Sequence, residues 1–255
     1  MGVDRMTVHF VGAGPGAADL ITVRAARMLA VADVVLFPGT YLDAGMLGHC
    51  RADARLVDTQ DLDLDQMTAV MVAAHAEGAD VVRLASGDPS LYSALFEQTR
   101  RLDAADVPWD VTPGVPAYAA AAAVVGRELT VPLLTQSVVL TRAQSRSTAM
   151  PAGEALEAFA ATGATLVLHL ATARAREVAA SLVDDYGADC PVVVVHRASQ
   201  PEERVLRGTL TDIADQVESA GLRQAAVILV GRVLDPAGGG ESYLYDPARH
   251  RSRLA

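Results

Sequence analysis

Short apolar runs alternate with alanine-rich helical segments along almost the whole length of this 255-residue chain. The alternation predicts a parallel or mixed sheet flanked by helices, because strands that are covered on both faces are apolar throughout. Apolar residues make up 51% of the chain and charged residues 20%, which is enough apolar material for such a core. No apolar run reaches the roughly 20 residues of a membrane-spanning helix. The sequence therefore predicts an α/β fold without a membrane segment.

The pattern also predicts two α/β domains in one chain. A segment with two prolines and a glycine at 112–116 interrupts the pattern and marks the boundary. We expect a first domain at 1–113, a second at 114–234, and a loosely ordered tail rich in glycine and arginine at 235–255. The expected strands are 7–12, 33–37, 55–57, 80–85, 109–112, 137–141, 165–170, 191–196 and 225–230, with a hairpin partner at 204–208. The expected helices are 22–30, 65–77, 91–102, one opened by 119–123, 153–161, 173–186 and 209–220.

The charged residues exclude two kinds of catalytic site. All 21 basic residues are arginine, so the chain has no lysine for a Schiff base or for a Walker A phosphate loop. The 31 acidic residues give a formal net charge of −10. Long-range attraction to nucleic acid or to an anionic membrane needs clustered positive charge, so we expect neither as a partner. An anionic small molecule remains compatible with the sequence, since a local arginine cluster can bind it.

A glycine-rich loop, Gly12-Ala13-Gly14-Pro15-Gly16, follows the first expected strand. Such a loop lets backbone approach a ligand closely, and in dinucleotide-binding folds it leads into a helix that holds a pyrophosphate. This loop departs from that fingerprint in its G-x-G-x-G spacing and in Pro15, which has no N–H to donate. We therefore expect close approach to a ligand without phosphate binding; a plain strand-to-helix turn is the alternative.

A second motif, Ser86-Gly87-Asp88-Pro89, follows the expected strand at 80–85. Ligands of open α/β sheets bind at the carboxyl ends of strands, where an aspartate can receive a hydroxyl or an ammonium group. The alternative is structural: Asp88 would cap the next helix, and Pro89 would occupy the first helical position, where its missing N–H costs nothing.

A third motif is the expected strand at 137–141, which leads into Arg142 and Arg146. The planar guanidinium group pairs bidentately with carboxylates, so this strand end suits a ligand with several carboxylates. Two solvated surface arginines are the alternative.

The histidines and cysteines predict no metal or nucleophile site. None of the six histidines has a partner at metal-ligand spacing, no Ser/His/Asp order stands out, and we interpret His169 and His196 as core histidines. Cys50 and Cys190 are far apart in sequence and fit free thiols in a reducing cytoplasm. The amino terminus lacks the apolar stretch of a secretory signal.

Taken together, these motifs resemble the tetrapyrrole (uroporphyrinogen-III and precorrin) C-methyltransferase family. The matching segments keep their order from residue 7 to residue 234: 11–16 with 19–22, 86–89, 113–115 and 226–231. Other segments resemble the members that methylate carbon 11 of precorrin-4: 113–116 with 119–123, 128–130, 136–142, 150–154 and 189–192. Family members that methylate uroporphyrinogen itself carry an aspartate after the second strand, where this chain has Pro38-Gly39.

The resemblance implies two α/β domains with S-adenosylmethionine in the cleft between them, and a homodimer, for which the free thiols predict a cytoplasmic location. Ten positions match the cofactor contacts of the family: Pro15, Ser86, Gly87, Asp88, Leu91, Pro116, Ala117, Leu170, Ala198 and Ala226. Pro116 and Ala117 replace hydroxyl-bearing residues, so we expect backbone contacts there, and Leu170 replaces a methionine while keeping an apolar contact. For the carboxylate arms of the tetrapyrrole we expect Arg142 and Arg146, with Arg127 and Arg197 as weaker candidates.

The implied reaction moves a methyl group from S-adenosylmethionine to C11 of precorrin-4 and gives precorrin-5. The sulfonium methyl is already electrophilic and the macrocycle carbon is electron-rich, so the protein has to place two molecules in line and needs no nucleophile of its own. The cobalt-loaded intermediate and another ring position remain alternatives as acceptors. Members of the same fold also methylate ribosomal RNA or serve diphthamide synthesis, and a non-catalytic binding module is a further alternative.

Overall fold

The computed structural model describes residues 7–39, 42, 44–143 and 148–243. The chain forms two compact units: residues 1–120 with 197–201, and residues 121–196 with 202–255. The expected hinge at 112–116 therefore lies inside the first unit, where the Gly114 backbone packs against Gly12. The division falls within helix α4 (Ala117–Val125), later than the predicted boundary after residue 113. Residues 244–255 of the expected tail lie outside the described part.

The first unit is built on a five-stranded sheet with the order β3-β2-β4-β1-β5. All four of its strand pairs are parallel. Every residue of β1 and of β4 is buried, because both strands lie inside the sheet with helices over both faces. The strands are β1 (Val8–Gly12), β2 (Val34–Phe37), β3 (Arg55–Asp58), β4 (Val81–Ala85) and β5 (Trp109–Thr112).

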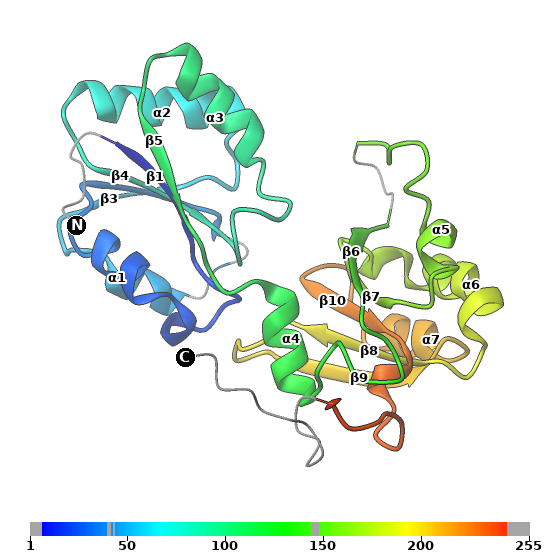
Figure 1. The fold of residues 1–255 in the computed structure, drawn as a ribbon. Helices are drawn as coiled ribbons and strands as arrows, with labels where there is room; N and C mark the ends of the chain where they lie inside the picture. Colours follow the sequence, from blue (N-terminus) through cyan, green and yellow to red (C-terminus); the bar gives the residue numbers. More distant parts are fainter. Residues whose placement is uncertain (1–6, 40–41, 43, 144–147, 244–255) are drawn as a thin grey trace, which may run out of the picture. The chain divides into compact units, whose positions relative to one another are not determined.

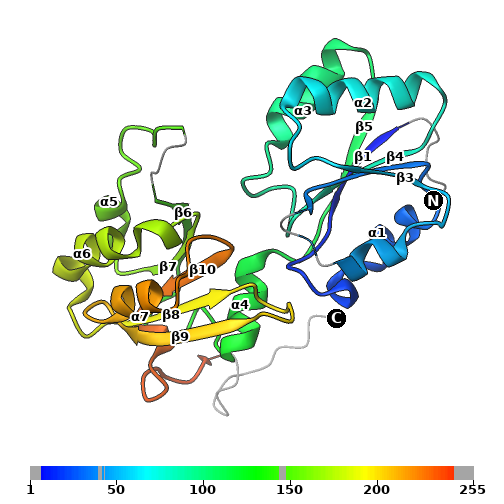
Figure 2. The same ribbon diagram turned by 180° about the vertical axis from the view of Figure 1, so that it is seen from behind.

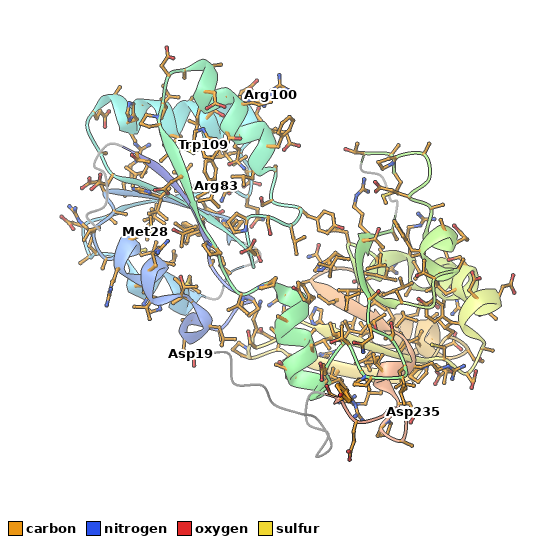
Figure 3. All side chains as sticks on the ribbon, viewed as in Figure 1. Asp19, Met28, Arg83, Arg100, Trp109 and Asp235 are labelled. Carbon is orange, nitrogen blue, oxygen red and sulfur yellow. The ribbon has the colours of Figure 1, made fainter. Side chains whose placement is uncertain are left out.

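Helices cover both faces of this sheet (Figure 1). On one face, α1 (Val23–Leu29) packs Met28 and Leu29 against Val11 and Val35. On the other face, α2 (Leu64–Ala76) and α3 (Leu95–Ala104) pack against Val8 and Phe10. Figure 3 shows the labelled Met28 and Arg83 on opposite sides of the sheet. The predicted pattern of helices and strands is confirmed in this unit.

The helix α3 begins at Leu95, later than the expected start at residue 91. Tyr92 and Ala94 have left-handed backbone angles, with φ of 53° and 56°, which an α-helix does not contain. The alternative interpretation of Asp88 as the cap of this helix is therefore wrong, because residues 89–94 form a loop and Ala94 is the residue that precedes the helix. By contrast, α1 begins at Val23, one residue after the expected start, and Thr22 caps it: the Thr22 hydroxyl accepts a bond from the Ala25 N–H at 3.1 Å.

The second unit holds a mixed five-stranded sheet with the order β6-β7-β10-β8-β9. The β6–β7 pair is parallel and the other three pairs are antiparallel. The strands are β6 (Val138–Arg142), β7 (Thr165–His169), β8 (Pro191–His196), β9 (Arg204–Thr209) and β10 (Ala226–Val230). The predicted hairpin is confirmed, since β8 and β9 pair along their whole length from Pro191 opposite Thr209 to His196 opposite Arg204.

Three helices of the second unit pack on one face of its sheet (Figure 2). These are α5 (Leu156–Ala160), α6 (Ala175–Tyr186) and α7 (Ile213–Ser219). Short 3-10 turns complete the two units: η1 (Ala18–Leu20), η3 (Ala44–His49), η4 (Thr172–Arg174) and η5 (Arg232–Leu234). The fold prediction of two α/β domains is thus confirmed. Within the described ranges, no helix has the length and apolar content to cross a membrane.

Candidate functional site

Two neighbouring strands of the first sheet send their loops to opposite faces. The chain leaves β1 toward α1 on one face and leaves β4 toward α3 on the other, although β1 and β4 pair directly. This is a topological switch point, the place in an open α/β sheet where the diverging loops leave room for a ligand. The glycine-rich loop follows β1 and the Ser86–Pro89 motif follows β4, so the fold brings the first two motifs together.

Backbone bridges join these two loops. The Gly14 N–H donates to the Gly87 carbonyl at 3.1 Å, and the Gly87 N–H donates to the Gly14 carbonyl at 2.8 Å. Gly14 and Gly87 have φ of 78° and 69°, in the left-handed region that glycine adopts without strain. The loop after β1 then passes through η1 before α1 begins, so it is more than the plain strand-to-helix turn of the alternative interpretation.

A third backbone segment, the one that follows β5, packs against these two loops. A Cβ atom on Gly12 would lie 2.4 Å from the Gly114 nitrogen, and one on Gly114 would lie 2.2 Å from the Gly87 carbonyl oxygen. A Cβ on Gly87 would come 3.5 Å from the Ala117 nitrogen, which places the Pro116-Ala117 step beside the Ser86–Pro89 motif. The three glycines therefore permit the approach of backbone to backbone, and we call Gly12, Gly87 and Gly114 the glycine cluster.

Asp88 fastens the segment after β5 to the loop after β4. Its Oδ2 accepts from the Gly114 N–H at 2.8 Å, and its Oδ1 accepts from the Ser90 N–H at 2.8 Å and from the Ser90 hydroxyl. Burial by itself raises the pKa of Asp88, but the bonds from Ser90 and Gly114 together hold that pKa below its ordinary value. Asp88 is thus an ionised, half-buried carboxylate at the switch point.

The loop between Asp88 and α3 rests on a buried arginine. Arg83, 8% exposed, donates from Nε to Gln98 Oε1 at 3.1 Å and also to the Leu84 carbonyl. Gln98 in turn donates to the carbonyls of Ser93 and Ala94 at 3.2 and 3.1 Å. Burial lowers the pKa of Arg83 to about 10, so the guanidinium stays charged at neutral pH. This network supports the loop that carries Leu91.

Residues 197–201, at the tip of the β8–β9 hairpin, belong to the first unit. The Ser199 hydroxyl accepts from the Ala17 N–H at 3.1 Å, and the Gln200 side-chain amide donates to the Pro15 carbonyl at 3.2 Å. Ala198 in the same tip is 6% exposed. The structure therefore brings Pro15, Ser86, Gly87, Asp88, Pro116, Ala117 and Ala198 into one unit. Ser199 and Gln200 were not among the predicted site residues.

The other predicted cofactor contacts lie in the second unit. Leu170 directly follows β7, with φ of 53° and 60% of its surface exposed. Ala226 begins β10 and lies opposite His196 of β8. Extending the β7–β10 register by two residues from the Leu168–Ile228 pair places Leu170 opposite Ala226. These two residues thus share one end of the second sheet.

The structure describes three of the four predicted substrate arginines. Arg142 ends β6 opposite His169 of β7, and its guanidinium donates to the Thr148 carbonyl at 2.7 Å. Arg127 follows α4, Arg197 belongs to the hairpin tip of the first unit, and Arg146 lies outside the described residues. Burial lowers the pKa of His169, which therefore carries no charge at neutral pH. Over the described ranges, no group of three or more His, Cys, Asp or Glu side chains could hold a metal ion.

Comparison with known proteins identifies the family and the fold of this chain. The sequence model of the tetrapyrrole (corrin/porphyrin) methylases matches residues 7–214. The precorrin-4 C(11)-methyltransferase of Rhodococcus erythropolis is 54% identical over 97% of this chain and 99% of its own length. A solved cobalt-precorrin-4 methyltransferase, 38% identical, superposes with a TM-score of 0.87 over 91% of this chain and 97% of its own.

A further solved relative carries a ligand. The uroporphyrin-III C-methyltransferase of Thermus thermophilus, complexed with S-adenosyl homocysteine, is 27% identical, with a TM-score of 0.75 over 90% of this chain and 93% of its own. The resemblance inferred from the ordered motifs is therefore confirmed over nearly the whole chain. The chain belongs to the tetrapyrrole (corrin/porphyrin) methylase family.

Proposed function

We propose that this chain transfers the methyl group of S-adenosylmethionine to C11 of precorrin-4, giving precorrin-5 in cobalamin biosynthesis. The observation that carries the proposal is the 54% identity, over 97% of the chain, to a precorrin-4 C(11)-methyltransferase. In the balanced reaction, an electron pair of the macrocycle forms the bond from C11 to the methyl carbon, and the bond from that carbon to sulfur breaks with its electron pair staying on sulfur. The positive charge of the sulfonium thus passes to the macrocycle, and S-adenosylhomocysteine leaves as a neutral thioether. The cobalt-loaded intermediate is the alternative acceptor, because a relative that superposes well is a cobalt-precorrin-4 methyltransferase.

The residues at the switch point fit S-adenosylmethionine. The glycine cluster keeps side chains out of the junction of three loops, and Asp88 adds an ionised carboxylate that suits an ammonium or a hydroxyl group. We propose that Pro15, Ser86, Gly87, Asp88, Leu91, Pro116, Ala117 and Ala198 hold the cofactor from the first unit, and Leu170 and Ala226 from the second. The bound cofactor supplies an electrophilic methyl group.

The contribution of the protein is then placement. Asp88 and the bridged glycine loops fix S-adenosylmethionine, and the arginines hold the carboxylate arms of the tetrapyrrole. Methyl transfer then takes place within one complex instead of between two molecules that meet in solution. Holding two reactants in line can account for a large share of a rate enhancement, on the order of 7 kcal/mol or more. Neither a protein nucleophile nor lysine chemistry is required, which agrees with a chain whose basic residues are all arginine.

The direct test is incubation of the purified chain with S-adenosylmethionine and precorrin-4, followed by mass spectrometry and NMR of the product. One added methyl group at C11 is the expected result, and parallel reactions with the cobalt-loaded intermediate rank the two acceptors. Methylation at another ring carbon, or S-adenosylmethionine consumption with neither acceptor, would overturn the assignment.

We expect Arg142→Ala to raise the KM for the tetrapyrrole about 10-fold to 100-fold, because a charge-assisted hydrogen bond to a carboxylate contributes about 1.5 to 3 kcal/mol. Arg146, Arg127 and Arg197 are proposed partners of the remaining arms. Steady-state kinetics measure the effect. Arg176→Ala is the matched control, since Arg176 is an exposed arginine of α6 paired with Asp215 and Glu218. An unchanged KM in Arg142→Ala removes this residue from the substrate site.

We further propose that the enzyme is a homodimer that works in the cytoplasm on this small molecule, without nucleic acid or membrane partners. The two free cysteines suit a reducing compartment, and the net charge of −10 disfavours polyanionic partners. Light scattering of the purified chain gives the oligomeric state. A monomer mass, or a salt-dependent gel shift with RNA, counts against this assignment.

A further inference from the structure

Two side chains from late in the sequence restrain three consecutive residues of the glycine-rich loop. Ser199 Oγ accepts from the N–H of Ala17, and Gln200 Nε2 donates to the carbonyl of Pro15. Between them, Gly16 leaves the space that the Gln200 side chain fills: a Cβ atom on Gly16 would lie 2.3 Å from Gln200 Cγ. The two residues therefore hold the 15–17 backbone from both sides of Gly16.

The hairpin tip adopts a costly conformation to make these contacts. Arg197 and Ser199 have φ of 47° and 67°, in the left-handed region that is unfavourable for residues other than glycine. Such a residue persists only where its surroundings hold it, and such strain clusters at functional sites. Ser199 has a left-handed φ and also bonds to the glycine-rich loop, so the backbone strain and the contact with that loop occur at the same residue.

The loop restrained in this way lies beside the glycine cluster. Pro15 and Gly16 directly follow Gly14, whose backbone is bridged to Gly87 in both directions. Asp88, the next residue after Gly87, fixes Gly114. The loop after β1 is thus held on one side by the motif after β4 and on the other by the hairpin tip. Without the hairpin tip, only the backbone bonds between Gly14 and Gly87 remain of these two restraints.

We propose that Ser199 and Gln200 are positioning residues for the cofactor, since their side chains hold the Pro15–Ala17 backbone in the conformation that receives it. The inference rests on the proposed function, because it assumes that the loop binds S-adenosylmethionine. The two residues act through the loop, and they need not touch the cofactor. Their loss weakens cofactor binding and leaves the affinity for the tetrapyrrole unchanged.

The experiment compares Ser199→Ala, Gln200→Ala and the double variant with the natural chain, using calorimetry with S-adenosylhomocysteine. Each single variant should bind it about 3-fold to 10-fold more weakly, the equivalent of one net hydrogen bond, with an unchanged KM for the tetrapyrrole. Ser199→Gly adopts the φ of 67° without strain but also lacks the hydroxyl, so it should bind as weakly as Ser199→Ala does. Gln200→Glu keeps the size and loses the donor, so it should behave as Gln200→Ala does. Gln136→Ala is the control, since Gln136 is an exposed glutamine of the second unit whose side chain donates to the Thr135 carbonyl at 3.1 Å.

A second readout is independent of cofactor and activity. The Ala17 amide hydrogen should exchange faster in Ser199→Ala than in the natural chain, because it loses its acceptor. If exchange rises while the affinity for S-adenosylhomocysteine stays the same, the bond is structural only and the inference is overturned. An equal loss of affinity for cofactor and tetrapyrrole also overturns it. If the natural chain itself binds no S-adenosylhomocysteine, the proposed function fails first, and that result is distinguishable from the other two.

Discussion

Gly114→Ala is expected to lower the free energy of unfolding by about 3 kcal/mol, at the upper end of the cost of overpacking. The new methyl group would lie 2.2 Å from the Gly87 carbonyl oxygen and 2.7 Å from the Gly12 Cα. Both neighbours are backbone atoms, so no rotamer change can relieve the clash. Relief requires the loops after β1, β4 and β5 to move apart, and the bond from the Gly114 N–H to Asp88 is then lost as well. Denaturant unfolding and calorimetry with S-adenosylhomocysteine should show the two losses together.

Gly48→Ala is the control for this substitution. Gly48 lies in η3 of the same unit, and no atom comes within 4 Å of a Cβ built on it. The free energy of unfolding of Gly48→Ala should differ from that of the natural chain by no more than about 0.5 kcal/mol, the range of ordinary surface substitutions. If Gly114→Ala is as stable as Gly48→Ala and binds the cofactor equally well, close packing of the three loops is not what Gly114 provides.

Asp88→Asn should weaken the binding of S-adenosylhomocysteine about 10-fold to 100-fold, although the two side chains have the same shape. The two carboxylate oxygens of Asp88 serve different donors, Oδ2 the Gly114 N–H and Oδ1 the Ser90 N–H. The side chain of asparagine has only one acceptor oxygen, so one of these two backbone N–H groups must face the NH2 group instead of an acceptor. Losing a bond to a charged acceptor costs about 1.5 to 3 kcal/mol. Calorimetry measures the change, and Asp61→Asn, an exposed carboxylate of the same unit, is the control.

The contribution of Asp88 to stability should also depend on pH. Its pKa is lower in the folded chain than the ordinary value, so ionised Asp88 stabilises the fold above the unfolded pKa of about 4, and this contribution is lost as the pH falls through the folded pKa. The difference in unfolding free energy between the natural chain and Asp88→Asn should therefore be constant above about pH 5 and shrink below about pH 4. A difference that does not change from pH 7 to pH 3 contradicts the assignment.

The sequence predicts the strands of this protein well because buried parallel strands are apolar on both faces. Val81–Ala85 of the parallel sheet is an example, and the buried centre of Pro191–His196 in the mixed sheet is apolar in the same way although that strand pairs antiparallel, since such runs of branched apolar residues fit few other structures. The start of α3 was less predictable. Residues 91–94 carry no glycine or proline that would mark a break, and the left-handed angles of Tyr92 and Ala94 depend on the surrounding loop. Local propensity therefore placed that helix too early.

The parts of the candidate site that are recognisable within one short stretch of sequence were predictable. The motif at 86–89 and the loop at 12–16 stand out by their glycines, and their position at strand ends predicts that they meet. Ser199 and Gln200 could not be found in this way, because their partners Ala17 and Pro15 lie 182 and 185 positions away in sequence. The only local signal is a polar Ser-Gln pair before Pro201 at a hairpin tip, which many solvent-exposed turns share.

The hairpin tip has a consequence for building hybrids of this enzyme with its relatives. The chain passes from one unit to the other at 120/121, again at 196/197 and again at 201/202, so a single cut cannot separate two complete folding units. A chimera that exchanges only residues 1–120 would combine the loop after β1 of one parent with the hairpin tip of the other. If residues 197–201 are exchanged together with residues 1–120, both sides of that contact come from one parent. We therefore expect more chimeras to fold when the parents are joined at 120/121, 196/197 and 201/202 than when they are joined at 120/121 alone.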